Sequence, residues 1–185
     1  MTAPTWRKGR LLVASPSLVD PNFHRTVVLL LEHSTDGALG VVLNRPSHLN
    51  TRETLPDTFA ASIPGDEHIY EGGPVEPESV ILLAEFTDSD HDAGLAIGSI
   101  GIVDPATDFE TLPDRVRAIR AFGGYAGWAA GQLEAEIDEE AWIDAVCLAS
   151  DVFTSEPELL WSQVLDRKGG NFRLVARMPM DPSLN

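Results

Sequence analysis

The stretch "GGYAGWAAGQLEAEI", residues 123–137, is the most strongly patterned part of this chain. Four glycines and two aromatic residues occupy its first nine positions, and apolar residues then follow at helical spacing. Glycine adopts backbone conformations that are closed to other residues, and apolar residues three or four apart mark one face of a helix. The stretch therefore predicts a sharp corner, with positive φ at Gly124 and Gly127, that leads through Gly131 into a helix.

The same corner also suggests an anion site, because a helix N-terminus offers unpaired N–H groups. Its glycine spacing, however, matches neither G-x-G-x-x-G nor G-x-x-x-x-G-K-[ST], the two common nucleotide-binding patterns. Five acidic residues between positions 134 and 140 oppose a phosphate and complement the helix dipole. We therefore interpret the stretch first as scaffold, in which Tyr125 and Trp128 bury their rings while the acids of the helix face water.

Outside this stretch, apolar runs rich in β-branched residues predict two hairpins. Residues 26–32 and 38–43 flank a turn that contains glycine, which is typical of a hairpin. Residues 79–86 and 95–103 predict a second hairpin around the acidic tip 87–94. That tip resembles a calcium loop, but its spacing lacks the required turn glycine and bidentate acid, so we interpret it as a solvated hairpin end.

The remaining segments are strands and helices without regular alternation. Residues 115–122 fit either a helix or a strand, and residues 141–149 predict a strand. A helix is expected to start at Thr154 or Ser155 and to end just before Gly169. Strands followed by scattered helices predict an α+β fold rather than a doubly wound parallel sheet.

Composition limits the possible partners. The 185 residues carry a net charge of −16, and a chain of this length predicts one domain, residues 1–185, whose core needs no disulfide or metal. Each half of the chain carries −8, with 6 basic and 14 acidic residues in the first and 7 and 15 in the second. We therefore expect no direct contact with nucleic acid or with acidic membranes. The basic clusters at 7–10 and 115–120 are interpreted as solvated charges.

Several chemistries lack their sequence patterns. The five scattered histidines and one cysteine provide no structural zinc pattern, and no G-x-S-x-G elbow indicates a serine hydrolase. Cys147 lies in an apolar run and is expected to be a buried, unreactive thiol. The apolar run 11–14 is too short for a signal peptide, and 27–31 is too short for a membrane helix. We expect a cytoplasmic protein without cofactor or metal, of undetermined oligomeric state.

Four segments occur here together in the order found in one bacterial family. They are "LLVASPSLVDPNFHRTVVLLLEHSTDGALGVVLNRPS" (11–47), "YEGGPV" (70–75), the stretch 123–137 and "PMDPSLN" (179–185). On these segments the chain resembles the YqgE/AlgH family over nearly its whole length. One departure is Ala130, where the family often has proline.

The resemblance implies an α+β fold of mixed β-sheets partly rolled together, with a few flanking helices, in the bacterial cytosol. It implies no enzymatic reaction, and the AlgH name reflects a proposed transcriptional regulatory role in alginate production. Motif residues carried over as a candidate binding surface are Asn44, Arg45, Pro46, Gly72, Gly73, Tyr125, Gly127, Trp128, Gln132 and Glu134. The requirements of turns in the backbone explain the presence of Arg45 and Gln132 less easily than that of the glycines and the proline.

Two functional hypotheses follow. The preferred one is a non-enzymatic protein that binds an unidentified protein or small ligand, with regulatory consequences and without direct DNA contact. The alternative is an uncharacterised enzyme, or a protein that binds a nucleotide or another small ligand, whose site combines the glycine turn 123–131 with Arg45. An enzyme should show a cleft in which several polar groups converge.

Overall fold

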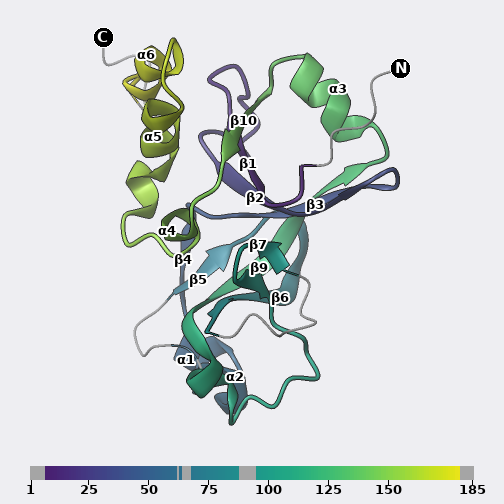
Figure 1. Ribbon diagram of the computed structural model, residues 1–185, viewed down its shortest axis with the longest axis vertical. Coiled ribbons are helices and arrows are strands. Elements are labelled where there is room, and N and C mark those ends of the chain that lie inside the picture. The colour runs from purple at the N-terminus through teal and green to yellow at the C-terminus, as the bar shows by residue number, and fades with distance from the viewer. Residues whose placement is uncertain (1–6, 62, 64–67, 88–94, 180–185) are drawn as a thin grey trace.

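A computed structural model describes residues 7–61, 63, 68–87 and 95–179 (Figure 1). The strands are β1 (Arg10–Ala14), β2 (Val27–Ser34), β3 (Gly37–Val42), β4 (Pro46–Asn50), β5 (His68–Glu71), β6 (Val75–Phe86), β7 (Leu95–Ile97), β8 (Ile100–Ile102), β9 (Val116–Ala129) and β10 (Trp142–Val146). The helices are α1 (Thr51–Thr54), α2 (Asp57–Ala60), the 3-10 turn η1 (Leu112–Arg115), α3 (Gln132–Asp138), α4 (Ala149–Val152), α5 (Pro157–Lys168) and α6 (Phe172–Ala176).

The strands form one open, mixed sheet. Its main path runs β10-β1-β2-β3-β9-β6-β8-β7, while β5 pairs with β9 and with β4. The β5–β9 pair is parallel and the other pairs described are antiparallel. The α5–α6 pair lies beside one end of the sheet, and α1 and α2 lie at the other (Figure 1). The fold is α+β, as predicted, and the sheet does not close on itself.

Strand β9 joins the two halves of this sheet. It pairs with β6 between Val116 and Tyr125 and with β3 between Ala126 and Ala129. The segment 115–122 is therefore mostly strand. The corner predicted in the stretch after it is wrong because β9 bends there and continues to Ala129, but Gly131 leads into helix α3 as predicted. Gly124 has the expected positive φ of 67°, whereas Gly127 lies within the extended strand.

The bend in β9 lies where two pairs of glycines meet. The amide N–H of Gly72 donates to the carbonyl of Gly123 at 2.8 Å. A Cβ on Gly72 would lie 2.3 Å from the Gly124 carbonyl oxygen, and one on Gly124 would lie 2.6 Å from that of Gly73. We call Gly72, Gly73, Gly123 and Gly124 the glycine crossing. The two backbones approach too closely for any side chain to lie between them.

Most of the other predicted elements are confirmed, with three corrections. Strands β2 and β3 form the first hairpin. The return arm of the second hairpin is broken at Gly98 into β7 and β8, and its tip, 88–94, lies outside the described residues. Strand β10 is shorter than 141–149. Helix α5 ends as predicted but begins after Glu156, whose N–H donates to Thr154 Oγ1 at 3.1 Å.

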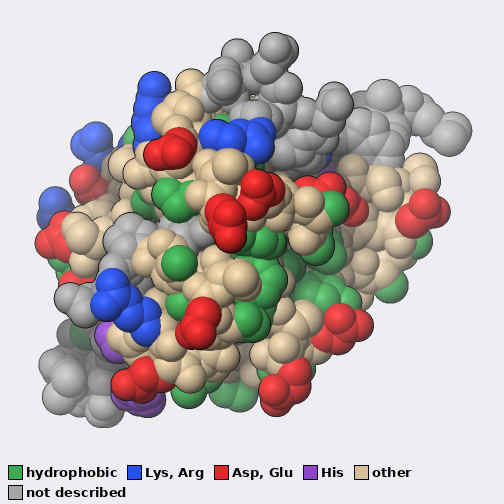
Figure 2. All heavy atoms as spheres, turned by 90° about the horizontal axis from the view of Figure 1, so that it is seen from below, with side chains coloured by type: hydrophobic (Ala, Val, Ile, Leu, Met, Phe, Trp, Pro, Cys, Tyr) green, Lys and Arg blue, Asp and Glu red, His purple; other side chains and the backbone are tan. Residues whose placement is uncertain are grey.

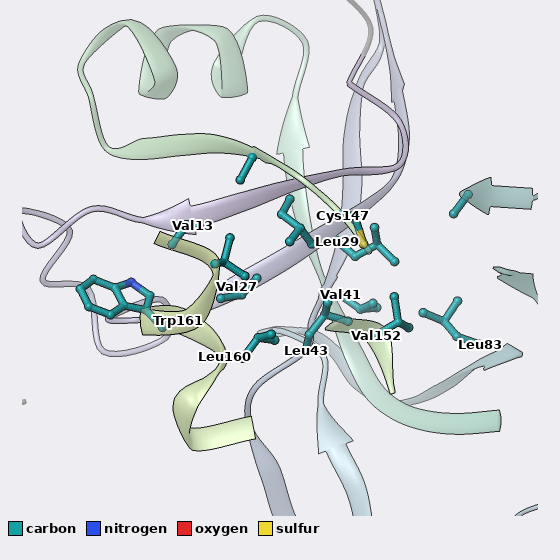
Figure 3. Packing of buried hydrophobic residues seen from close by; sticks show 14 of the residues in the cluster. Val13, Val27, Leu29, Val41, Leu43, Leu83, Cys147, Val152, Leu160 and Trp161 are labelled. Atoms are coloured by element: carbon teal, nitrogen blue, oxygen red, sulfur yellow. The ribbon is translucent and has the colours of Figure 1, made fainter. Parts of the chain in front are cut away.

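Helix α5 packs against the sheet through a large apolar cluster (Figure 3). The side chains labelled there include Val13, Val27, Leu29, Val41, Leu43, Leu160 and Trp161. The indole Nε1 of Trp161 donates to the Ala14 carbonyl at 2.8 Å, and Lys168 Nζ, in the last turn, donates to the Asp144 carbonyl at 2.6 Å. These two bonds attach the N-terminal half and the last turn of α5 to strands β1 and β10, so the helix is held against the sheet along its length.

The basic cluster 115–120 is not entirely solvated. Arg120 is only 5% exposed, its Nη1 donates to the Val152 carbonyl at 3.1 Å, and its guanidinium lies 4.4 Å from the centre of the Tyr70 ring. That prediction was wrong for this arginine because β9 carries it into the interior. Among the described residues, no helix is long and apolar enough to cross a bilayer.

The glycine crossing gives a direct test of the fold. We expect Gly124→Ala to lower the free energy of unfolding by about 3 kcal/mol, because a Cβ there combines a left-handed backbone with overpacking. Gly98→Ala is the matched control, since Gly98 also has positive φ, 52°, but nothing lies within 4 Å of its Cβ position. Urea unfolding should show a loss of only about 1 kcal/mol there. Equal losses in the two variants would contradict the close approach.

Candidate functional site

Asn44 and Arg45, in the "LNRP" motif between β3 and β4, both hold the loop that precedes β2. Asn44 Oδ1 accepts the Val27 N–H and its Nδ2 donates to the Arg25 carbonyl, each at 2.9 Å. Arg45 donates from Nη1 to the Asn22 carbonyl at 2.7 Å and from Nη2 to the His24 carbonyl at 3.1 Å. The motif therefore fixes two loops against each other.

Arg25, which the sequence analysis did not select, completes this arrangement. Its guanidinium donates to the carbonyls of Met178 and Pro179 at 2.8 and 2.7 Å and lies 4.0 Å from the centre of the Trp161 ring. Its backbone has a φ of 55°, a conformation that costs a non-glycine residue about 1–2 kcal/mol. The only signal in the sequence was a basic residue placed just before the apolar run 27–31.

These residues line a cavity of about 640 Å³ between the loops and helices α5 and α6, which we call the arginine cleft. One wall consists of His24, Arg25, Asn44, Arg45 and Pro46. The other consists of Pro157, Glu158, Leu159, Trp161, Ser162, Ala176 and Met178. Leu159 and Met178 are 43% and 48% exposed, so the cleft combines cationic and apolar surface.

The arginine cleft is positively charged although the chain is acidic. Arginine stays protonated in proteins, and burial lowers the pKa of Arg25 without removing its charge at neutral pH. The hydrogen bonds of Arg25 and Arg45 go to backbone carbonyls. Within the described part of the chain, neither arginine forms an ion pair. Glu158 is the one acidic residue in the lining.

The structure separates the candidate residues of the sequence analysis. Gly73 lines a second cavity, of about 550 Å³, that shares Arg45 with the arginine cleft. Tyr125 is half-buried against the core, and Gly127 is exposed on β9 opposite Leu39. Of the glycine stretch, Gly123 lines this second cavity together with Arg45, whereas Tyr125, Gly127, Trp128 and Gln132 line neither of the two cavities.

Trp128 and Gln132 belong to a hydrogen-bonded cluster around one carboxylate, that of Glu136. Its Oε2 accepts the indole N–H groups of Trp128 and Trp142 at 2.9 and 2.7 Å, and its Oε1 accepts from Gln132 Nε2 at 2.9 Å. Trp128 is 7% exposed, which agrees with the scaffold interpretation. The expectation that all acids of this helix face water is wrong for Glu136, because two buried indoles need an acceptor.

Glu134 is also engaged within the fold. Its Oε1 lies 2.7 Å from Nε2 of His33, whose Nδ1 accepts the Arg7 N–H at 3.1 Å. Burial alone would raise the pKa of Glu134, but its backbone hydrogen bond and the contacts with His33 and Arg7 lower it overall. Since both ring nitrogens of His33 are hydrogen-bonded, we interpret this pair as structural.

Cys147, which follows β10, has the environment expected of an unreactive thiol. Its side chain is 3% exposed, and burial, reinforced by Asp151, raises its pKa to about 12. Among the described residues, no three His, Cys, Asp or Glu side chains converge to hold a metal ion. The arginine cleft, by contrast, brings two arginines that are held by backbone carbonyls to the lining of one cavity.

Sequence comparison decides the family. A model of the AlgH-like family matches residues 11–173. The chain belongs to the AlgH-like family. Its relatives include a UPF0301 protein of Streptomyces coelicolor, which is 43% identical over an alignment 192 residues long. That alignment covers 100% of this chain and 98% of that protein. Another, from Thermobifida fusca, is 42% identical over 96% of this chain and 94% of its own length.

Two solved structures agree with this AlgH-like assignment. The crystal structure of protein DIP2367 from Corynebacterium diphtheriae has a TM-score of 0.84 and 29% identity, covering 96% of this chain and 95% of that chain. The solution structure of AlgH from Pseudomonas aeruginosa has a TM-score of 0.71 and 31% identity, covering 97% of each chain. None of these names specifies a reaction.

Trp128 provides the test of the scaffold interpretation. We expect Trp128→Ala to lower the free energy of unfolding by about 3–5 kcal/mol, because a large buried ring leaves a cavity. Trp128→Phe keeps most of the ring and should lose only about 1 kcal/mol with the hydrogen bond. Denaturant unfolding of both variants measures the difference. A loss below about 1 kcal/mol for Trp128→Ala would contradict the interpretation.

Cys147 provides a test of burial. We expect its thiol to resist a disulfide reagent at pH 8 in the native protein and to react completely after denaturation. Folding raises the pKa of the Cys147 thiol from an ordinary value of about 8.5. The protonated thiol therefore makes its full contribution to the free energy of unfolding below about pH 8.5, and this contribution is lost as the pH rises towards 12. Rapid reaction of the native protein at pH 8 would show that the thiol is accessible.

Proposed function

We propose that this AlgH-like protein is a non-enzymatic binding protein whose arginine cleft holds a small ligand with a carboxylate or phosphate group and an apolar body. One observation carries the proposal. Arg25 and Arg45 are held in place by backbone carbonyls, so their positive charges are fixed but not neutralised. Each guanidinium has five N–H donors and therefore retains donors for the oxygen atoms of a ligand.

The shape of the cleft supports a ligand of this class. Its volume of about 640 Å³ lies within the range of about 300–1,000 Å³ typical of small-molecule sites. Trp161, Leu159 and Met178 offer apolar surface beside the two arginines. The strained backbone of Arg25 adds support, because such strain tends to occur at functional sites.

A catalytic role is less well supported. The hydroxyl Oγ of Ser162 donates to the Leu159 carbonyl at 2.9 Å. A backbone carbonyl is not a base that could activate this hydroxyl as a nucleophile. A nucleotide site on the glycine turn is also not favoured. Backbone atoms of Gly73 and Val75 fill the space where a side chain of Gly124 would lie, and Glu71 and Glu78 line the cavity beside Gly123, where they oppose a phosphate.

Aromatic anions can test the proposal. Benzoate and phenyl phosphate distinguish a carboxylate from a phosphate, and phenol is the uncharged comparison. We expect at least one anion to bind, and Arg45→Gln and Arg25→Gln to weaken it by about tenfold or more, since a hydrogen bond to a charged group is worth about 1.5–3 kcal/mol. Calorimetric titration and the Trp161 indole NMR signal measure this binding.

Arg173→Gln is the matched control, because it removes the same charge from an exposed position on α6. It should leave the affinity unchanged, and phenol should bind about tenfold more weakly than the better anion. A random DNA duplex should not be retained at physiological salt, because the charge of −16 repels a polyanion. Failure of both anions, or an equal loss in Arg173→Gln, would refute the proposal.

A further inference from the structure

A third cavity lies at the end of the sheet opposite the arginine cleft, between the α1–α2 segment, strands β6 and β8, and the loop 103–109. Its volume is about 300 Å³, and all ten described residues that line it are apolar. They include Leu55, Phe59, Val80, Leu82, Ile102 and Phe109. Figure 2 views the molecule from this end and shows hydrophobic side chains exposed among acidic residues.

The walls of this apolar pocket are built by local hydrogen bonds. The Asp104 carboxylate accepts the Ala106 N–H at 2.7 Å, and the Asp108 carboxylate accepts the Glu110 N–H at 3.0 Å. These two turns place Phe109, whose ring meets that of Phe59 edge-on with centroids 4.3 Å apart. Val80 is 45% exposed at the pocket, so apolar surface remains in contact with water.

Acidic residues adjoin the pocket lining along the chain. Asp57 follows Pro56, Asp104 lies between Val103 and Pro105, and Asp108 and Glu110 flank Phe109. All four acids are exposed. An anionic amphiphile such as a fatty acid would bring its charge close to these carboxylates, which is unfavourable. The ligand class is therefore uncharged or cationic.

We propose that this pocket binds a small, uncharged or amine-bearing aromatic molecule of about two fused rings. Apolar cavities of about 150 Å³ bind benzene, so one of about 300 Å³ suits a bicyclic ring system and is too small for a helical peptide. The site is independent of the arginine cleft in both position and charge preference.

Three naphthalene derivatives test this proposal with one ring system: 2-naphthol, 2-naphthylmethylamine and 2-naphthoate. Titration monitored by methyl NMR should shift the signals of Val80, Ile81 and Ile102 with the first two compounds. Val80→Trp, which places an indole in the pocket, should weaken binding of 2-naphthol by about tenfold or more. Val146→Trp is the control, because Val146 is a 58% exposed strand residue outside the pocket lining.

The outcomes also separate the two cavities. Here, 2-naphthoate should bind about tenfold more weakly than 2-naphthol, and Arg45→Gln should leave 2-naphthol binding unchanged. If Val80→Trp does not fold, the methyl shifts of the wild-type protein test the proposal by themselves. Shifts at Val80, Ile81 and Ile102 would support it, and shifts confined to residues outside the pocket would overturn it. Equal binding by Val80→Trp and wild type, no binding of either favoured compound, or stronger binding of 2-naphthoate at these methyl groups would also overturn it.

Discussion

The close contact between the backbones of β5 and β9 is the constraint on which the rest of the structure depends. At the glycine crossing, a Cβ on Gly73 would lie 2.2 Å from the backbone of Tyr125, so the contact exists only without side chains. It allows β9 to leave β6 and continue beside β3. The same region holds the end of β3, because the Val42 N–H donates to the Gly72 carbonyl and the Glu71 N–H to the Arg45 carbonyl. The position of Arg45 therefore depends on the crossing.

Sequence patterns identified what is determined locally. The hairpin 26–43 and the end of α5 follow from apolar periodicity and turn or capping residues near in the chain. The role of the stretch 123–137 does not follow from such local patterns. In a sequence, a glycine that a close approach of two backbones requires looks the same as a glycine that a turn requires. Its partner, Gly72, lies about fifty residues earlier in the chain. Arg25 was missed for the same reason, since its contacts are with Trp161, Met178 and Pro179.

The basic residues of this acidic chain are mostly committed to the fold. Arg10 pairs with Asp144 and Arg167 with Asp151, while Arg120 lies over Tyr70. Arg25 and Arg45 differ because their guanidinium groups donate to uncharged backbone carbonyls, so no acidic side chain among the described residues neutralises their positive charge. A charge of −16 repels anions at long range, but screening confines that repulsion to about 8 Å at physiological salt. A small anion, the ligand class that we propose, therefore suits the cleft better than a polyanion, because its whole charge reaches the arginines while most of a polyanion's charge stays outside.

The arginine cleft and the apolar pocket differ in how the fold maintains them. The arginine cleft lies between loops and α5, and it is kept open by hydrogen bonds between segments far apart in the chain, such as that from Trp161 to Ala14. The apolar pocket rests on β6 and β8 and is enclosed by short-range turns at Asp104 and Asp108. Long-range bonds are lost together when the domain unfolds, whereas a turn at the surface can open locally. We therefore expect that opening the arginine cleft requires more of the fold to unfold than opening the loop 103–109 beside the apolar pocket.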